Sequence, residues 1–361
     1  MTLLIHNEEV SRIQAVGPSV ASSAPPKGSA QILMTNILIS TRQVHMVSIT
    51  GLFLIILGFL IVNSTAFIQS VFVFGAQNLP ISPFESQRTP DFSIAAVGDL
   101  GCSPEVKKMV NVINNETMEL ILILGDLSYQ RESADCWFDI VSPIDQRMKI
   151  VLGDQDYRAN SVLRQYKSHF NLSQEYYSFD YENVHFVALA TEIPYDFKSP
   201  QYNFVKNDLK AASRNPDIKW IIVYSYRPQY SSPTEHPGNR DLRDTFHPLF
   251  QKYSVDLVLQ AHNHNYERTY PIKYNEISSS EPIVADSNSN TYENPAGQMY
   301  VTVGTGGAQL HGLDGKALYV SNQYMGHGFL EISLTHNGRN LTGTFYSNDD
   351  GSIEDSFTII K

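Results

Sequence analysis

The sequence predicts an α/β fold, and three observations support this prediction. Short apolar runs of strand length alternate with helix-like stretches from Asp91 onward, as expected for a sheet covered by helices. Polar side chains able to ligate metals follow several of these runs directly, at the strand ends where open α/β sheets hold ligands. The chain has 361 residues, 42% of them apolar, which allows a packed core in one large domain or two small ones.

The composition excludes some classes of function. The chain has 26 Lys and Arg against 37 Asp and Glu, and a net charge of -11. Because phosphate contacts to nucleic acids need an excess of basic residues, we expect no nucleic-acid partner. The cysteines, Cys102 and Cys136, are too few for a zinc-thiolate site. Each is either a small buried residue or half of one bridge in an oxidising compartment. No pattern in the sequence indicates an oligomeric state.

The N-terminal part is predicted to contain a tail and a membrane segment. Residues 1–46 show no periodic apolar face, so we predict a disordered tail. The run SITGLFLIILGFLIVNSTAF follows, and no Lys, Arg, Asp or Glu occurs between Arg42 and Glu85. A helix of about twenty residues spans roughly 30 Å, the thickness of bilayer hydrocarbon. We therefore predict a transmembrane anchor or a signal h-region at 47–68, followed by a linker at 69–91. A buried soluble helix of this kind is less common.

The basic residues give this segment an orientation. Arg42, Lys27 and Arg12 lie on its N-terminal side, so the positive-inside rule places the tail in the cytoplasm and the rest of the chain outside it. A start at Met34 or Met46 would instead make the segment a cleavable signal peptide. The expected location is therefore either membrane-anchored with an extracytoplasmic domain or secreted.

Residues 92–361 form the predicted domain. Two of its helix-like stretches begin with Ser-Pro, a Ser that suits an N-cap and a Pro that suits the first helical turn: SPEVKKMVNVIN from Ser103 and SPQYNFVKNDLKAA from Ser199. After Pro271 the helix-like stretches stop. A polar insertion at about 275–297 then precedes further strand-like runs: QMYVTVG, GFLEISLT, LTGTFYS and SFTIIK.

Candidate metal ligands end the apolar runs of this domain. Asp99, Asp126 and Asp154 end the first three runs, and His262 with His264 follows the run DLVLQ. Each aspartate alone is as well explained as a turn residue. Together they form a set of oxygen and nitrogen donors at one expected sheet edge, which suits Fe, Zn or Mn.

These residues lie in motifs that resemble a known family. The blocks GDLG, GDLSY, GDQD, YRPQY, AHNHNYERTYP, GTGGAQL and GHGFLEI resemble, in order and spacing, the calcineurin-like metallophosphoesterase superfamily. They are most similar to its purple acid phosphatase branch over roughly 92–361. The resemblance implies a four-layer αββα sandwich with a dinuclear metal centre. It also implies hydrolysis of phosphate monoesters by a metal-activated water.

The resemblance implies a ligand set for each of the two metal ions. The first ion, Fe(III), would take Asp99, the bridging Asp126, the phenolate of Tyr129, and His264. The second ion, Fe(II), Zn(II) or Mn(II), would take Asp126 again with three residues of its own: Asp154, Tyr226 and His262.

The sequence departs from the family pattern at three of these positions. Asp154 stands where the family has Asn, and a carboxylate should still bind a metal. Tyr226 stands where the family has His; its phenol must lose a proton to bind well and its oxygen lies farther from the backbone, so the second ion should bind weakly or be displaced. Gln155 stands where the family has a catalytic His, and an amide cannot protonate a leaving group. His236 lies in a loop where plant-type members carry phosphate-contacting histidines, and it is the candidate for that role.

Two hypotheses follow for the function. In the first, the protein is a metallophosphoesterase in which Asp126, Gln155 and His236 serve catalysis on a phosphate ester. In the second, it is a catalytically impaired, membrane-tethered protein that binds metal or phosphate and retains only the first metal site. Two of the three departures fall on second-metal ligands and the third on the neighbouring acid, which is what partial loss of function would produce.

Overall fold

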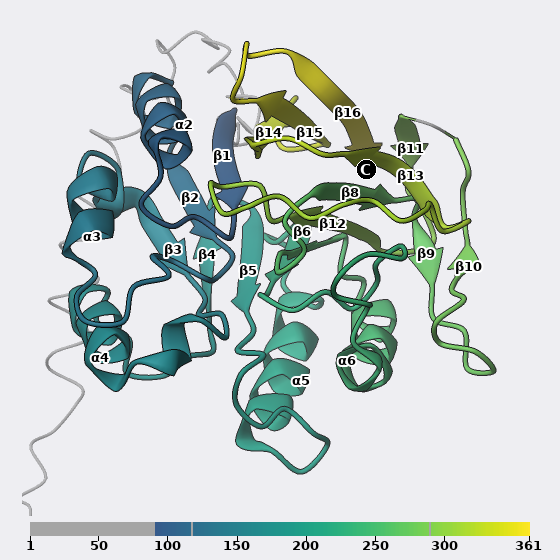
Figure 1. Cartoon of the computed structure of the whole chain (residues 1–361). Helices are drawn as coiled ribbons and strands as arrows, with labels where there is room; N and C mark the ends of the chain where they lie inside the picture. The colour runs from purple at the N-terminus through teal and green to yellow at the C-terminus, as the bar shows by residue number, and fades with distance from the viewer. Residues whose placement is uncertain (1–90, 117, 289) are drawn as a thin grey trace, which may run out of the picture. The chain divides into compact units, whose positions relative to one another are not determined.

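The computed structural model describes residues 91–116, 118–288 and 290–361 (Figure 1). The predicted tail, membrane segment and linker lie outside the described residues, except for Asp91. Within the described residues, no helix is both long enough and apolar enough to cross a membrane.

The first large sheet has the strand order β11-β16-β15-β14-β1-β2-β3. Its members are β1 (Phe92–Val97), β2 (Leu120–Ile123), β3 (Met148–Ile150), β11 (Thr291–Glu293), β14 (Gly328–Thr335), β15 (Asn340–Ser347) and β16 (Ile353–Ile360). Strands β1, β2 and β3 are parallel, whereas β14 returns antiparallel to β1. The last three C-terminal strand-like runs of the sequence, which form β14, β15 and β16, therefore extend the same sheet that the domain begins with, whereas the run QMYVTVG forms β12 of the second sheet.

The second large sheet has the order β13-β8-β12-β7-β6-β5-β4. Its members are β4 (Tyr177–Tyr181), β5 (Val184–Ala188), β6 (Trp220–Tyr224), β7 (Leu257–Gln260), β8 (Tyr266–Thr269), β12 (Met299–Val303) and β13 (Val320–Tyr324). Strands β5, β6, β7 and β12 are parallel. A small ribbon pairs β9 (Ile272–Lys273) with β10 (Ile283–Val284). The insertion predicted as polar loop thus contains β10 and β11.

The two large sheets pack face to face. One buried cluster joins Ile94 and Leu122 of the first sheet to Phe186, Ile222 and Leu259 of the second. Neighbouring residues along each strand point to the opposite face, because side chains alternate along a strand. This arrangement confirms the two-sheet α/β sandwich that the family resemblance implies.

Helices cover the outer face of each sheet (Figure 1). The helices α2 (Pro104–Asn115), α3 (Asp135–Val141) and α4 (Asn160–His169) share a core with β1, β2 and β3, and α5 (Pro200–Ala212) and α6 (Arg240–Lys252) share one with β5, β6 and β7. Two short 3₁₀ turns, η1 (Asp145–Arg147) and η2 (Asp156–Arg158), flank β3. The layers are therefore helices, sheet, sheet, helices.

The two predicted Ser-Pro helix starts are confirmed, but they are built differently. Ser199 accepts a hydrogen bond from the backbone N–H of Tyr202 and caps α5. Ser103 makes no side-chain cap; its hydroxyl donates to the carbonyl of Gly307 at 3.0 Å. Ser103 therefore ties the start of α2 to the loop after β12.

Candidate metal centre

The predicted ligands lie at the carboxyl ends of strands in both sheets. Asp99, Asp126 and Asp154 follow β1, β2 and β3, and Tyr226 and His262 follow β6 and β7. Because the strands within each of these groups are parallel, their carboxyl ends share one edge. The side chains that the sequence spreads over more than a hundred positions are thus brought together where the sheets meet.

The backbone is strained at several of these positions. Asp99, Asp126, Tyr129 and His262 have positive φ angles of 57°, 51°, 58° and 71°. For residues with a Cβ atom this left-handed region costs roughly 1 kcal/mol or more, and such strain collects at functional sites. This left-handed conformation turns the chain in the loops that follow the strands and directs these side chains toward the centre.

Glycines permit the close approach of the loops. A Cβ atom on Gly153 would lie 2.2 Å from Oδ1 of Asp126 and 2.8 Å from Cε2 of Tyr226. A Cβ atom on Gly304 would lie 2.6 Å from Oδ2 of Asp99. Any side chain at either position would displace the carboxylates, so these glycines serve the site as well as the turns.

The ligands predicted for the first metal ion converge. The Tyr129 hydroxyl donates to Oδ1 of Asp99 at 3.1 Å, and Nε2 of His264 lies 3.0 Å from that hydroxyl and 3.3 Å from the same Oδ1. Nδ1 of His264 donates to the carbonyl of Gln309, so its Nε2 faces the carboxylate. Oδ2 of Asp99 accepts from the backbone N–H of His262 at 2.8 Å.

The ligands predicted for the second metal ion are joined by the phenol of Tyr226. Its hydroxyl oxygen lies 2.6 Å from Oδ2 of Asp126, 2.9 Å from Oδ1 of Asp154 and 2.7 Å from Nδ1 of His262, so its one proton is donated to one of the two carboxylates at a time. Burial and the nearby carboxylates of Asp99 and Asp126 raise the pKa of Tyr226. In this arrangement the residue is a neutral phenol hydrogen-bonded to its three neighbours, whereas metal binding requires a phenolate.

Buried carboxylates crowd the centre. Burial, followed by the charges of Asp99 and Asp156, raises the pKa of Asp126 to about 9. Burial raises the pKa of Asp156 to about 7, although its carboxylate accepts from the backbone N–H groups of Leu127 and Gly153. A bound cation would remove this repulsion, because opposite charge favours the ionised carboxylates.

The side chain of Gln155 is hydrogen-bonded to Arg131 and Asp154. Its Oε1 accepts from Arg131 at 3.1 Å and its Nε2 donates to Oδ2 of Asp154 at 3.4 Å, while its backbone N–H donates to Oδ1 of Asp126. The residue therefore supports the loop after β3 and offers no transferable proton.

His236 lies against the centre, where the sequence predicts it. Its ring stacks on His262 with centroids 3.9 Å apart and an angle of 15° between the planes. Both its backbone N–H and its carbonyl are hydrogen-bonded to the side chain of Asn263. Burial lowers the pKa of His236.

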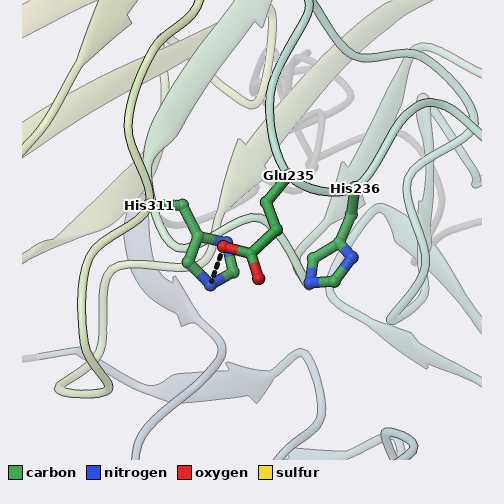
Figure 2. Close-up of side chains that lie close together, drawn as sticks. All are labelled: Glu235, His236 and His311. Atoms are coloured by element: carbon green, nitrogen blue, oxygen red, sulfur yellow. Dashed lines mark ion pairs between the residues drawn. The ribbon is translucent and has the colours of Figure 1, made fainter.

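Three further residues at the centre were not predicted from the sequence: Glu235, His311 and Arg227. The ring of His311 stacks on His264, with centroids 3.8 Å apart, and it faces the carboxylate of Glu235 (Figure 2). Arg227 pairs with Glu192 through two hydrogen bonds of 2.6 and 2.8 Å. No spacing rule connects these residues. The one signal in the sequence was that each residue lies next to a residue or motif already singled out. Glu235 precedes His236, Arg227 follows Tyr226, and His311 follows the GTGGAQL block.

Two pockets flank the centre. One of about 510 Å³ is lined by Tyr129, His264 and His311 together with neighbouring loop residues. The other, of about 360 Å³, is lined by Arg227, His236 and residues at the start of α6. A small ligand can therefore approach the centre from two sides, beside the stacked rings of His264 and His311 or beside those of His236 and His262.

Comparison with known proteins agrees with this geometry. Residues 92–266 match the calcineurin-like phosphoesterase family. Purple acid phosphatase 21 of Arabidopsis thaliana is 28% identical over 235 residues, which is 59% of this chain and 49% of the relative. Acid phosphatase type 7 of Homo sapiens is 25% identical over 253 residues, 60% of this chain and 55% of the relative. The described domain belongs to the calcineurin-like phosphoesterase superfamily, on its purple acid phosphatase-like branch. The chain spans about half the length of the curated relatives it matches.

Solved structures share the fold of this phosphoesterase domain. A purple acid phosphatase from yellow lupin (Lupinus luteus) seeds gives a TM-score of 0.64 at 22% identity, over 75% of this chain and 54% of the other. GAP50, described as the anchor in the inner membrane complex of Plasmodium, gives 0.58 at 19% identity, over 75% of this chain and 89% of that protein. At this identity the likeness concerns the fold alone.

The two predicted metal positions of this phosphoesterase domain differ in their fit. At the first, Asp99, Tyr129 and His264 present oxygen and nitrogen atoms within 3.0–3.3 Å of one another, a hard donor set that suits an iron ion. At the second, the Tyr226 hydroxyl is within hydrogen-bond distance of the other expected metal ligands, which are Asp126, Asp154 and His262. The first set fits the family's metal once Tyr129 loses the proton that it donates to Asp99. The second does not fit while Tyr226, which stands where the family has an imidazole, keeps its proton between Asp126 and Asp154.

Proposed function

We propose that the domain is a metal-dependent phosphoesterase that hydrolyses phosphate monoesters, as its purple acid phosphatase relatives are named to do. The observation that carries this proposal is the convergence of Asp99, Tyr129 and His264 at the carboxyl edge of the sandwich, beside Asp126. A site of this composition holds a metal ion, and the paired pockets beside it give a phosphate ester access.

When bound, the metal would supply Lewis acidity, lower the pKa of a bound water and neutralise phosphate oxygens. The chain's own residues then bind and orient the substrate. Arg227 lines the pocket beside His262 and, held in place by Glu192, presents Nη1 toward the centre at 3.5 Å from Nε2 of His262. His236 lines the same pocket and is the group placed to give a proton to a leaving oxygen.

The position of Gln155 sets an expected preference among substrates. Because its amide is hydrogen-bonded to Arg131 and Asp154 and has no acidic proton, it cannot assist departure of an alkoxide. Aryl phosphates and phosphoanhydrides have leaving groups that need little protonation. They should therefore be cleaved better than alkyl phosphates, and a rate independent of leaving-group pKa would speak against this role.

A second candidate function is a membrane-tethered protein that binds metal or phosphate without turnover. The specific observation in its favour is the Tyr226 hydroxyl, which lies 2.6–2.9 Å from donors of the second metal ion. GAP50, which shares this fold, is described as the anchor in the inner membrane complex of Plasmodium, so the fold also occurs in a protein described as an anchor. In both candidates we propose that residues 47–68 anchor the chain in a membrane or direct its secretion.

Metal content and turnover on the same sample separate the two candidates. The full-length chain, purified without chelator, would be analysed for metal ions per chain, for a tyrosinate–iron absorption band, and for hydrolysis of an aryl phosphate. Metal-dependent turnover that is lost in Asp126→Ala supports the phosphoesterase. One metal ion per chain, the iron band and no turnover support the binding protein instead.

A further inference from the structure

We infer that Glu235, His236 and His311 form a separate cation site at the mouth of the centre, of the kind that binds Zn²⁺. One potential ligand atom from each of the three lies within 4.8 Å of the others. Figure 2 shows the three side chains pointing toward one another from two different loops. Glu235 and His236 belong to the loop between β6 and α6, and His311 belongs to the loop between β12 and β13.

The ligand types and spacing suit a tetrahedral zinc ion. Two histidines and one glutamate with a water in the fourth position make a common zinc site. Ligand atoms at zinc-binding distance lie roughly 3.3 Å apart in a tetrahedron. Nε2 of His311 and Oε2 of Glu235 are already 3.4 Å apart. Small rotations of His236 and Glu235 would complete the set.

The two imidazoles are held in place before any cation binds. The loop at His236 is fixed by both hydrogen bonds to Asn263, and the ring lies against His262. The ring of His311 lies against His264 in the same manner, with an interplanar angle of 13°. Only Glu235, whose side chain is 63% exposed, would lose much freedom on binding. Preorganised ligands of this kind lower the cost of binding.

Binding would require one change at His311. The backbone N–H of His264 donates to Nδ1 of His311 at 3.2 Å, which leaves the ring proton on Nε2, facing Glu235. A cation at Nε2 moves this proton to Nδ1, so the ring stays neutral. Because Nδ1–H would then face the backbone N–H of His264, the hydrogen bond is lost and the His311 ring must shift away from that group. No proton, electron or further reactant is consumed.

This cation site shares no residue with the predicted metal centre, although Tyr226 of that centre precedes Glu235 and His236 in the same loop after β6. Its effect on the reaction rests on the proposed function: a cation bound to a ring nitrogen of His236 occupies the group that would protonate the leaving oxygen. The site would therefore act as an inhibitory zinc site, with the cation taken from solution.

The test measures Zn²⁺ binding directly. Equilibrium dialysis of the full-length chain with elemental analysis gives the equivalents bound, and the visible spectrum of Co²⁺ reports a four-coordinate site. The variant is Glu235→Gln, which removes one exposed ligand, and we expect its Zn²⁺ affinity at this site to fall by about 100-fold. The control is His169→Asn, because His169 is exposed and forms a pair with Asp145 at 3.2 Å, and within the described part of the chain this pair belongs to no candidate metal cluster.

An Asp99→Asn background separates this site from the centre. We expect one Zn²⁺ equivalent to remain in Asp99→Asn and to be lost when Glu235→Gln is added. Equal binding by the wild-type and Glu235→Gln chains overturns the inference, and that comparison decides the matter even if Asp99→Asn does not fold. If the wild-type chain binds this zinc but hydrolyses no phosphate ester, the proposed function fails and the site stands. If it hydrolyses the ester and zinc inhibits the wild-type and Glu235→Gln chains equally, the regulatory role fails.

Discussion

At the scale of single residues, Tyr226 determines what the second half of the centre can hold. A neutral imidazole offers a lone pair to a cation, whereas a neutral phenol must first lose its proton. Burial and the carboxylates around it raise the pKa of Tyr226, which makes that loss costly. Its hydroxyl proton instead lies between Asp126 and Asp154 and is donated to one of them at a time, which lessens the repulsion between the two carboxylates.

Tyr226→His is therefore expected to increase metal binding. An imidazole at this position restores a nitrogen donor beside Asp126, Asp154 and His262 and removes the competing hydroxyl. We expect elemental analysis to give one more equivalent of Zn²⁺ or Mn²⁺ per chain than in the wild type. Any aryl phosphatase activity should rise with it.

Tyr226→Phe is the matched control for this prediction. It removes the hydroxyl without supplying a donor, so it should not gain a tightly bound metal ion. Equal metal content in Tyr226→His and the wild type would show that the tyrosine does not limit the second position.

Residue types and their order predicted most of this centre, but not its hydrogen bonds. Asp99, Asp126 and His264 follow apolar runs whose ends must meet at one edge of a sheet, and the structure brings them together. The hydrogen bonds of the Tyr226 side chain depend on which groups the fold places around it, and these come from distant parts of the sequence. Glu235 and His311 meet only because two unrelated loops fold over the same edge, and no local pattern encodes that contact.

At the scale of elements, a disulfide ties helix α3 to the loop between β1 and α2. Cys102 follows the GDLG block, and Cys136 lies in the first turn of α3; the two are bonded, with Cα atoms 6.0 Å apart and a sequence separation of 34. The sequence left two alternatives for each cysteine, a small buried residue or half of a bridge, and the structure shows the bridge. A bridge is typical of chains that fold in an oxidising compartment.

Reduction of this bridge should destabilise the domain. For a loop of this length the chain-entropy model gives about 3–4 kcal/mol. We expect Cys102→Ser/Cys136→Ser to lower the urea midpoint of unfolding, and addition of reductant to the wild type to do the same. If reductant leaves the midpoint unchanged while thiol titration shows free cysteines, the bridge does not stabilise the domain.

Helix α6 contains a buried histidine that couples stability to pH. Nδ1 of His247 lies 2.7 Å from the hydroxyl of Tyr230, and Nε2 lies 3.1 Å from Oε1 of Gln298. A neutral ring satisfies both partners as acceptor and donor. Burial lowers the pKa of His247 to about 4, below the value of about 6.5 expected in the unfolded chain.

Acid should therefore weaken the fold through His247. The unfolded chain binds the proton first as the pH falls, so this contribution is complete above about pH 6.5 and is lost progressively toward pH 4. The loss between pH 7.5 and pH 5 is about 2 kcal/mol. Urea unfolding of the wild type and of His247→Gln at both pH values checks this. The variant should show a smaller difference between the two pH values, and an equal difference would contradict the assignment.

At the scale of the whole domain, two sheets share one hydrophobic interior, and this could not be read from periodicity. Alternating strands and helices are equally consistent with one doubly wound sheet. What closes the sandwich is long-range pairing: β14 returns beside β1, and β8 pairs antiparallel with both β12 and β13 in the second sheet. Only the resemblance to a family predicted the two-sheet sandwich, and the strand pairs themselves were not predicted, because strand registry between distant segments has no local signal.

A buried ion pair joins the two sheets across that interior. Arg268 of β8 donates through Nε and Nη2 to the two carboxylate oxygens of Asp355 of β16 at 2.6 and 3.0 Å, and Tyr266 donates to the same carboxylate at 2.7 Å. The two charged side chains are 1% and 4% exposed. Although burial works against ionisation, the hydrogen bonds and charge of Arg268 lower the pKa of Asp355. The pair therefore fixes how one sheet lies on the other.

Removal of one charge of the Arg268–Asp355 pair should lower the free energy of unfolding more than removal of both charges. Asp355→Ala leaves the Arg268 guanidinium in the interior without its carboxylate, so we expect a loss of about 3–5 kcal/mol in the free energy of unfolding. Arg268→Met/Asp355→Leu keeps much of the volume and removes both charges, and should cost clearly less than the single variant. Urea unfolding of the two variants and the wild type measures the difference. If the double variant is the less stable of the two, then packing around these side chains, rather than charge compensation between them, holds the sheets together.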